Sequence, residues 1–92
     1  MDTFDVKTRE DRREREEKLC HYPQEPCIVC GKGVDVHKTH IRIECVGGGI
    51  RACIPGEANV RDGGYMGSWP VGPMCARKIP ARFRIKHFGV PI

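Results

Sequence analysis

Large aliphatic and aromatic side chains are scarce in this chain of 92 residues. It has a single leucine, Leu19, and a single tryptophan, and hydrophobic residues make up 39% of the whole. A chain of this size with so few core-forming side chains needs a further source of stability, either disulfides or a bound metal ion. We therefore expect one small domain whose fold depends on one of these two.

Targeting and membrane signals are also missing. The opening residues, "MDTFDVKTRED", contain neither a basic n-region nor an apolar h-region. No segment approaches the roughly 18 consecutive apolar residues of a membrane span. We expect a cytoplasmic protein with no membrane partner, in which C-x2-C cysteines indicate metal or redox chemistry more often than disulfides.

Positive charge is concentrated near the end of the chain. The net charge is +4, and residues 71–92 hold five basic side chains and no acidic one. These are Arg77, Lys78, Arg82, Arg84 and Lys86. They are our predicted contacts for nucleic acid or for a protein partner with an acidic surface. The alternative is a solvated tail that keeps the protein soluble.

The expected fold class is α+β. Residues 1–20 are interpreted as a charged helix or arm, with a helix over 8–20 that begins at Thr8 and Asp11. Residues 21–92 form the second unit. There, alternation over 39–46 predicts a strand, and the glycines at 47–49 predict a turn to a partner strand over 50–54. We expect a loop over 55–68, an extended stretch before Cys75, and a helix from Cys75 that Pro80 interrupts; residues 81–88 fit either a helix or a strand.

Three cysteines are the strongest candidates for metal ligands. Cys27 and Cys30 are spaced C-x2-C in "CIVCGKG", and Gly31 permits the left-handed backbone that such a turn requires. Cys75 follows in "WPVGPMCARKIP". Structural zinc takes four cysteine or histidine ligands, and the residues leave the fourth open. The candidates are His37, His40, Cys45, Cys53, Cys20, His21 and His87. Of these, Cys45 and Cys53 are better interpreted as small buried hydrophobic residues than as ligands.

The segments "CIVCGKG", "KTHIRIECVGGG" and "GYMGSWPVGPMCARKIP" resemble a group of small uncharacterised phage and prophage proteins. Their pattern runs C-x2-C-G-K, then a strand histidine, a glycine turn and a G-x-x-P-x-G-x-x-C-x-x-K box. The resemblance covers residues 27–80. It implies a treble-clef-like zinc domain from a mobile element, working in the bacterial host cytoplasm. The strand histidine matches His40, which the resemblance therefore implies as the fourth ligand.

Together these observations predict a small zinc-stabilised α+β domain: a treble-clef-like zinc knuckle, a β-hairpin and a short helix. Its single Zn²⁺ is structural, held by Cys27, Cys30, Cys75 and His40. We expect a non-catalytic module that binds nucleic acid or a host protein, with no small-molecule substrate; its oligomeric state stays open.

The alternative function is a reduced nuclease of the His-Asn-His type. Its pattern would use His40, Gly48, Gly49 and Asn59. However, Thr39 stands where that family has an acidic residue, and the proline that follows the histidine is missing. A redox role for Cys27 and Cys30 fits less well, because the βαβ context of that motif is absent.

Overall fold

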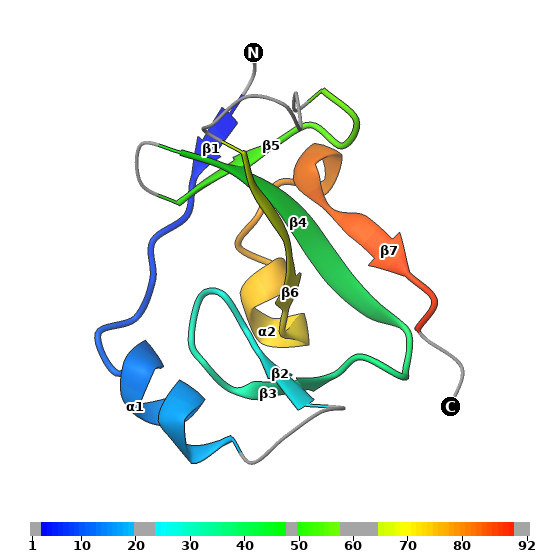
Figure 1. Ribbon diagram of the computed structural model, residues 1–92. Coiled ribbons are helices and arrows are strands. Elements are labelled where there is room, and N and C mark those ends of the chain that lie inside the picture. Colours follow the sequence, from blue (N-terminus) through cyan, green and yellow to red (C-terminus); the bar gives the residue numbers. More distant parts are fainter. Residues whose placement is uncertain (1–2, 20–23, 48–49, 58–64, 90–92) are drawn as a thin grey trace.

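Strand β4 (His40–Val46) is the element around which the fold is built (Figure 1). The computed structural model describes residues 3–19, 24–47, 50–57 and 65–89, and these form a small α+β fold made mainly of strands. The other strands of the main antiparallel sheet are β1 (Thr3–Asp5), β5 (Arg51–Cys53), β6 (Tyr65–Val71) and β7 (Ile85–His87). Their order is β1-β5-β4-β6, and β7 pairs with the first residues of β4.

The predicted strand over 39–46 and its partner over 50–54 are confirmed. β4 and β5 pair antiparallel, with Cys45 opposite Ala52. Ile43 and Cys45 are buried, as their shared face predicts for a strand with one side on the core. Gly48 and Gly49, at which the turn is predicted, lie outside the described residues.

The predicted loop over 55–68 is too long at its C-terminal end. β6 begins at Tyr65 and pairs with β4 along the whole strand, so that Ile43 lies opposite Trp69. The register shifts near Gly67, whose φ of 92° suits a β-bulge. Glycine content indicated a loop, but pairing with a long central strand supplies backbone hydrogen bonds that local sequence does not reveal.

The N-terminal residues join the main sheet, which the sequence did not predict. β1 pairs with β5, placing Thr3 opposite Cys53. The ring of Phe4 lies 5.9 Å from that of Phe83, the fully buried aromatic residue of the core.

Helix α1 (Arg12–Lys18) is shorter than the range predicted over 8–20. Asp11, not Thr8, precedes its first turn. Ahead of the helix, the N–H of Arg9 donates to the carbonyl of Val29 at 2.8 Å, which joins this segment to the C-x2-C segment. At the other end, Cys20 lies outside the described residues.

Two short helical turns follow β6. α2 (Pro73–Ala76) begins two residues before the predicted start at Cys75, with Pro73 in the first turn, where its missing N–H costs nothing. A 3-10 turn (Ala81–Phe83) then leads into β7. Residues 81–88, which fitted either a helix or a strand, thus contain a helical turn followed by a strand.

The core lies between the sheet, α2 and a second, two-stranded sheet of β2 (Gln24–Pro26) and β3 (Gly33–Asp35). Figure 1 shows that hairpin beside α2 and α1. The five cysteines of the described residues are buried. They account for much of a core that otherwise consists mainly of Ile, Val and Ala with a single Phe. None of the described helices has the length and apolar character needed to cross a membrane.

Candidate metal centre

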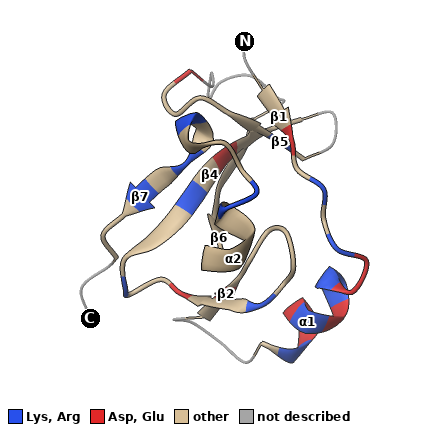
Figure 2. Ribbon diagram, turned by 180° about the vertical axis from the view of Figure 1, so that it is seen from behind, with Lys and Arg blue, Asp and Glu red and all other residues tan. Residues whose placement is uncertain are grey.

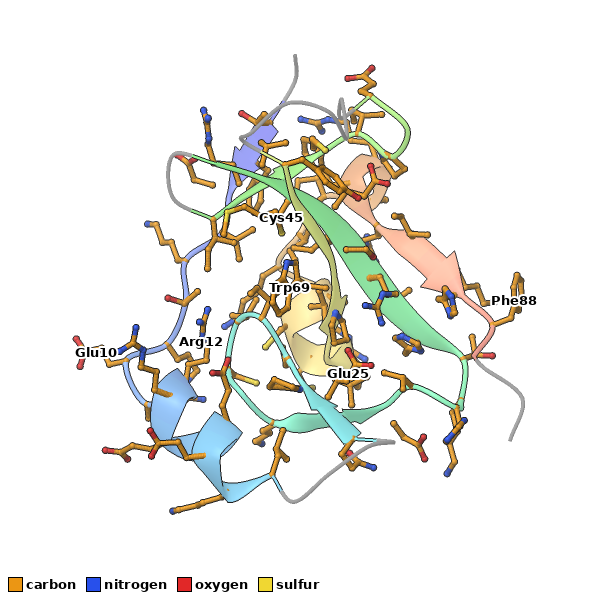
Figure 3. All side chains as sticks on the ribbon, viewed as in Figure 1. Glu10, Arg12, Glu25, Cys45, Trp69 and Phe88 are labelled. Carbon is orange, nitrogen blue, oxygen red and sulfur yellow. The ribbon has the colours of Figure 1, made fainter. Side chains whose placement is uncertain are left out.

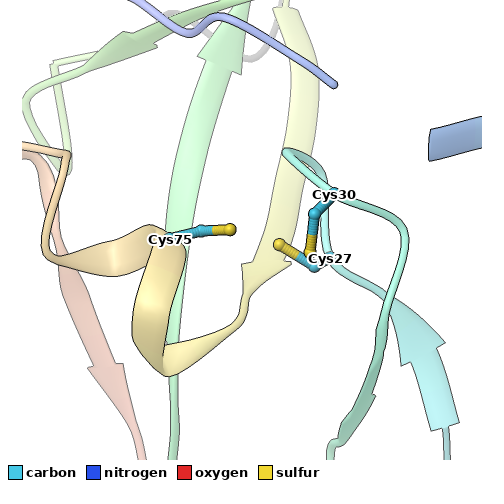
Figure 4. Close-up of side chains that lie close together, drawn as sticks. All are labelled: Cys27, Cys30 and Cys75. Carbon is cyan, nitrogen blue, oxygen red and sulfur yellow. The ribbon is translucent and has the colours of Figure 1, made fainter. Parts of the chain in front are cut away.

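Three buried cysteines from distant parts of the chain meet at one point (Figure 4). Cys27 and Cys30 come from the turn between β2 and β3, and Cys75 comes from α2. Their Sγ atoms all lie within 4.8 Å of one another, and their residues are 0%, 5% and 9% exposed. The structure thus brings together the three cysteines that the sequence singled out.

The turn that carries Cys27 and Cys30 is closed by its own backbone. The N–H of Gly31 donates to the carbonyl of Cys27 at 2.9 Å, and the N–H of Cys27 donates to the carbonyl of Lys32 at 2.8 Å. Gly31 has a φ of 78°, as predicted for this position. The residues on either side of Gly31 then pair as β2 and β3, with Pro26 opposite Gly33. Both thiols are therefore held on one rigid loop.

The third cysteine is positioned through the end of β6. The N–H of Ile28 donates to the carbonyl of Pro70 at 3.0 Å, which fixes the cysteine turn against that strand. Gly72 follows, and its N–H donates to Sγ of Cys27 at 3.2 Å. The N–H of Ala76 donates to the carbonyl of Gly72 at 2.9 Å, which forms the single helical turn that carries Cys75.

Helix α1 covers the outer side of the cysteine turn. Arg12, labelled in Figure 3, donates from Nη1 to the carbonyl of Ile28 at 3.1 Å. A Cβ atom at Gly31 would meet the carbonyl oxygen of Arg12 at 2.3 Å and the Cβ of Arg15 at 3.0 Å. Glycine is thus required here for close approach of the helix as well as for its backbone angle.

The pKa values of the Cys75 and Cys30 thiols are shifted in opposite directions. Burial raises the pKa of the Cys75 thiol to about 12, and the neighbouring Cys27 and Cys30 add to this rise. Burial also tends to raise the pKa of the Cys30 thiol. Hydrogen bonds from the Lys32 backbone and from the other two thiols outweigh this effect, so the pKa is lowered. The positive charge of Arg15 contributes to the lowered pKa of Cys30. Three thiolates at such distances repel one another, so full ionisation requires a cation among them.

The donor set fits a metal ion. Metal–sulfur distances of about 2.3 Å in a tetrahedral site put ligand sulfurs roughly 3.8 Å apart, within the limit that these three satisfy. Arg15, whose charge helps to lower the pKa of Cys30, pairs with Asp11 through Nη2 at 3.0 Å, and its buried Nη1 has no hydrogen-bond partner among the described residues. Arg15 and the amide of Gly72 are the contributors to this centre that the sequence did not reveal, because both act through contacts formed only in the fold.

The predicted fourth ligand, His40, is not part of this group. His40 shares a face of β4 with Arg42, whereas Ile43 and Cys45 on the other face belong to the core cluster that contains the three cysteines. Strand alternation therefore directs His40 away from the thiols. Of the other candidates, His37, His87, Cys45 and Cys53 also lie outside the group, and Cys20 and His21 fall outside the described residues.

Both ring nitrogens of His40 are already engaged. Nδ1 lies 2.8 Å from the carbonyl of Lys38 and donates to it, so Nε2 accepts from Nη1 of Arg42 at 3.1 Å. The His40 ring also lies 5.2 Å from the ring of His87. The remaining residues of the nuclease pattern, Gly48, Gly49 and Asn59, lie outside the described residues.

Four of the five predicted basic contacts are exposed. Arg77 and Lys78 directly follow α2, Arg82 lies in the 3-10 turn, and Lys86 lies on β7; Arg84 is half-buried. Figure 2 shows no acidic segment along the described chain from α2 to the end of β7. Beyond β7, Phe88 is 77% exposed, and Nζ of Lys86 lies 5.8 Å from the centre of its ring.

Comparison with protein-family models, curated proteins and solved structures finds no match for this chain.

Proposed function

We propose that this chain is a zinc-stabilised, non-catalytic module that binds nucleic acid through its basic C-terminal segment. The observation that carries the proposal is the position of Cys75, which belongs to the three-cysteine group and stands two residues before Arg77. A metal ion held there fixes the start of a segment that carries only positive charge. The residue that would hold the metal ion and the residues that would contact nucleic acid are thus adjacent in the chain.

Zinc is the metal that this donor set favours. Thiolates are soft ligands, and tetrahedral sulfur-rich sites in the cytoplasm hold zinc or iron–sulfur centres. A cysteine turn joined through strands to a short helix that supplies a ligand is the treble-clef-like arrangement that the phage-protein resemblance implies. That resemblance also supports a mobile-element origin and a site of action in the host cytoplasm.

Nucleic acid is the partner that the charge distribution supports. Arg77, Lys78, Arg82 and Lys86 are exposed and are separated by no acidic residue. Phosphate contacts by such side chains release counterions, so binding weakens with salt in proportion to the number of contacts. Exposed Phe88 beside Lys86 adds an apolar ring of the kind on which an unpaired base stacks.

The test is fluorescence anisotropy of the zinc-loaded protein with labelled duplex and single-stranded oligonucleotides over a range of salt concentrations. With four phosphate contacts, the plot of log affinity against log salt for duplex DNA should have a slope of about −3 to −4. Lys86→Glu should weaken binding and reduce the slope. Arg13→Glu is the matched control, because it makes the same charge change at an exposed position on α1 and should alter binding much less.

Two outcomes would contradict the proposal. One is no binding to any of the oligonucleotides at low salt. The other is an equal loss from Lys86→Glu and Arg13→Glu, which would mean that only net charge matters. The alternative partner is a host protein with an acidic surface. Binding of such a protein would then be compared between Lys86→Glu and Arg13→Glu.

A further inference from the structure

The three-cysteine group borders a cleft of about 470 Å³. Cys30 and Cys75 both line this cleft, so it reaches two of the three thiols. Its volume lies within the range of sites that hold small molecules. A molecule in the cleft is therefore within reach of any metal ion that these cysteines bind.

Among the residues that the structure describes, every charged side chain that lines the cleft is positive. They are Arg9, Lys32 and Lys78. Arg9 is paired with Asp11 at 3.2 Å, but neither lysine has an ion-pair partner among the described residues. Three thiolates around a divalent ion carry a net charge of −1. The two lysines can balance this charge and still attract an anionic group on a ligand.

The apolar part of the lining suits the carbon chain of such a ligand. Val29 and Pro73 form part of the wall, and Met74, which is 72% exposed, stands at the cleft. The donor set is entirely sulfur, and a thiolate-rich site favours a further soft donor over a hard oxygen. Among the described residues the metal-binding group has three members, one fewer than tetrahedral coordination takes.

We propose that the cleft admits a small acidic thiol, whose sulfur completes the coordination of the metal held by Cys27, Cys30 and Cys75. The thiol loses its proton to solvent as its sulfur binds the metal, and the acidic group of the same molecule pairs with Lys32 and Lys78. This inference rests on the proposed metal centre and extends it from a purely structural site to one with an exchangeable ligand.

The test replaces zinc by Co²⁺ in the full chain, with a phosphine as reductant so that no added thiol is present. Charge-transfer bands in the near ultraviolet report cobalt–thiolate bonds, and the visible bands report the complete coordination shell. Titration with 3-mercaptopropionate should shift the visible bands to a plateau. It should also raise the near-ultraviolet absorbance by roughly one third, as three thiolates become four.

A neutral thiol of similar size, 2-mercaptoethanol, measures the contribution of the lysines. We expect 3-mercaptopropionate to bind about tenfold more tightly than 2-mercaptoethanol, because of its carboxylate. Lys32→Glu and Lys78→Glu should each remove most of this preference while keeping the cobalt–thiolate bands. Arg77→Glu is the matched control, since it makes the same charge change beside Lys78 but does not line the cleft, and it should retain the preference.

The outcomes separate this inference from the proposed metal centre. Absence of near-ultraviolet bands would overturn the metal centre itself. Normal bands that do not respond to either thiol would overturn only the exchangeable ligand. Absorbance of four thiolates before any thiol is added would also overturn the exchangeable ligand. A decrease of that absorbance in Cys20→Ser would show that Cys20 of the chain itself is the fourth ligand. A response to acetate but not to 3-mercaptopropionate would overturn the thiol as the class of ligand.

Discussion

The backbone N–H of Gly72 donates a hydrogen bond to Sγ of Cys27 at 3.2 Å, although the two residues are 45 positions apart. This contact joins the cysteine turn to the end of β6 at the point where the chain enters α2. Beside it, the N–H of Ile28 reaches the carbonyl of Pro70. The geometry of the three-cysteine group therefore depends on the sheet, and the position of α2 depends in turn on that group.

Loss of the metal should unfold the protein, because the remaining core is small. Zinc binding to small domains provides roughly 10–16 kcal/mol of apparent free energy, more than the whole stability of most domains of this size. We expect native mass spectrometry to show one zinc ion per chain. Cys75→Ser should abolish zinc binding, and circular dichroism should show loss of folded structure in that variant and in the wild type treated with a chelator.

Cys45→Ala is the control for this experiment. Cys45 is as buried as the three grouped cysteines, at 1% exposure, but is not a member of that group. Its variant should be less stable and still bind one zinc ion. A Cys75→Ser protein that binds zinc and melts at the wild-type temperature would show that the group is not the metal centre.

Gly31 should be far less tolerant of substitution than Gly56, although both have positive φ. The angles are 78° and 86°, so an alanine at either position carries a similar backbone cost of about 1–3 kcal/mol. Only at Gly31 does the new Cβ meet other atoms, the carbonyl oxygen of Arg12 at 2.3 Å, whereas Gly56 has nothing within 4 Å. In chemical denaturation, Gly31→Ala should lower the free energy of unfolding by at least about 2 kcal/mol more than Gly56→Ala.

This comparison separates packing from backbone strain. Equal losses in the two variants would mean that α1 does not press on the cysteine turn. Zinc content measured on the Gly31→Ala protein adds a second result. Displacement of α1 should weaken zinc retention against a chelator, and Gly56→Ala should leave it unchanged.

The three members of the cysteine group could be predicted because their signals are local. C-x2-C-G describes a closed turn, and strand 39–46 follows from alternation of side chains within a few residues. The structure places His40, the predicted fourth ligand, outside the three-cysteine group. Alternation along β4 puts it on the face with Arg42, away from the thiols, whereas the prediction follows from the resemblance alone.

Other features could not be predicted because they depend on contacts between distant segments. β1 is three residues long and is defined by its pairing with β5, about fifty positions away. Thr8 is a good residue to begin a helix, but α1 begins after Asp11, and Arg9 before it donates its N–H to the distant Val29. The pairing of β1 shows tertiary contacts outweighing local preference.

Stability should fall at alkaline pH because of Cys45. Burial raises the pKa of its thiol from 9.0 to about 11, with a smaller contribution from Cys53. Between these values the unfolded chain loses this proton while the folded chain keeps it, so the free energy of unfolding decreases as pH rises from 9 to 11. The loss should be about 2 kcal/mol. In the metal-free chain the raised pKa of Cys75 would act in the same direction, so denaturation curves are measured on the zinc-loaded protein at several pH values. They should show the loss in the wild type and much less in Cys45→Ala; equal slopes in both proteins would contradict the assignment.

Arg42 should be required as an arginine because its guanidinium joins three segments. Nε donates to Oγ of Ser68 at 3.0 Å and Nη2 donates to the carbonyl of the same residue at 2.9 Å, which binds β4 to β6. Nη1 donates to Nε2 of His40, and Glu25 of β2 lies 4.0 Å from Nη2. The Arg42 side chain is 17% exposed, so water replaces these bonds poorly.

Lysine at this position keeps the charge but has no planar fork. Arg42→Lys should therefore lose at least two of the hydrogen bonds and lower the free energy of unfolding by about 2 kcal/mol. Arg77→Lys, at an exposed position, should change it by less than about 0.5 kcal/mol. Zinc content should remain at one ion per chain in both variants, because His40 and Arg42 lie outside the three-cysteine group. Loss of zinc from Arg42→Lys with the fold retained would instead show that the His40 side of β4 supports the metal centre.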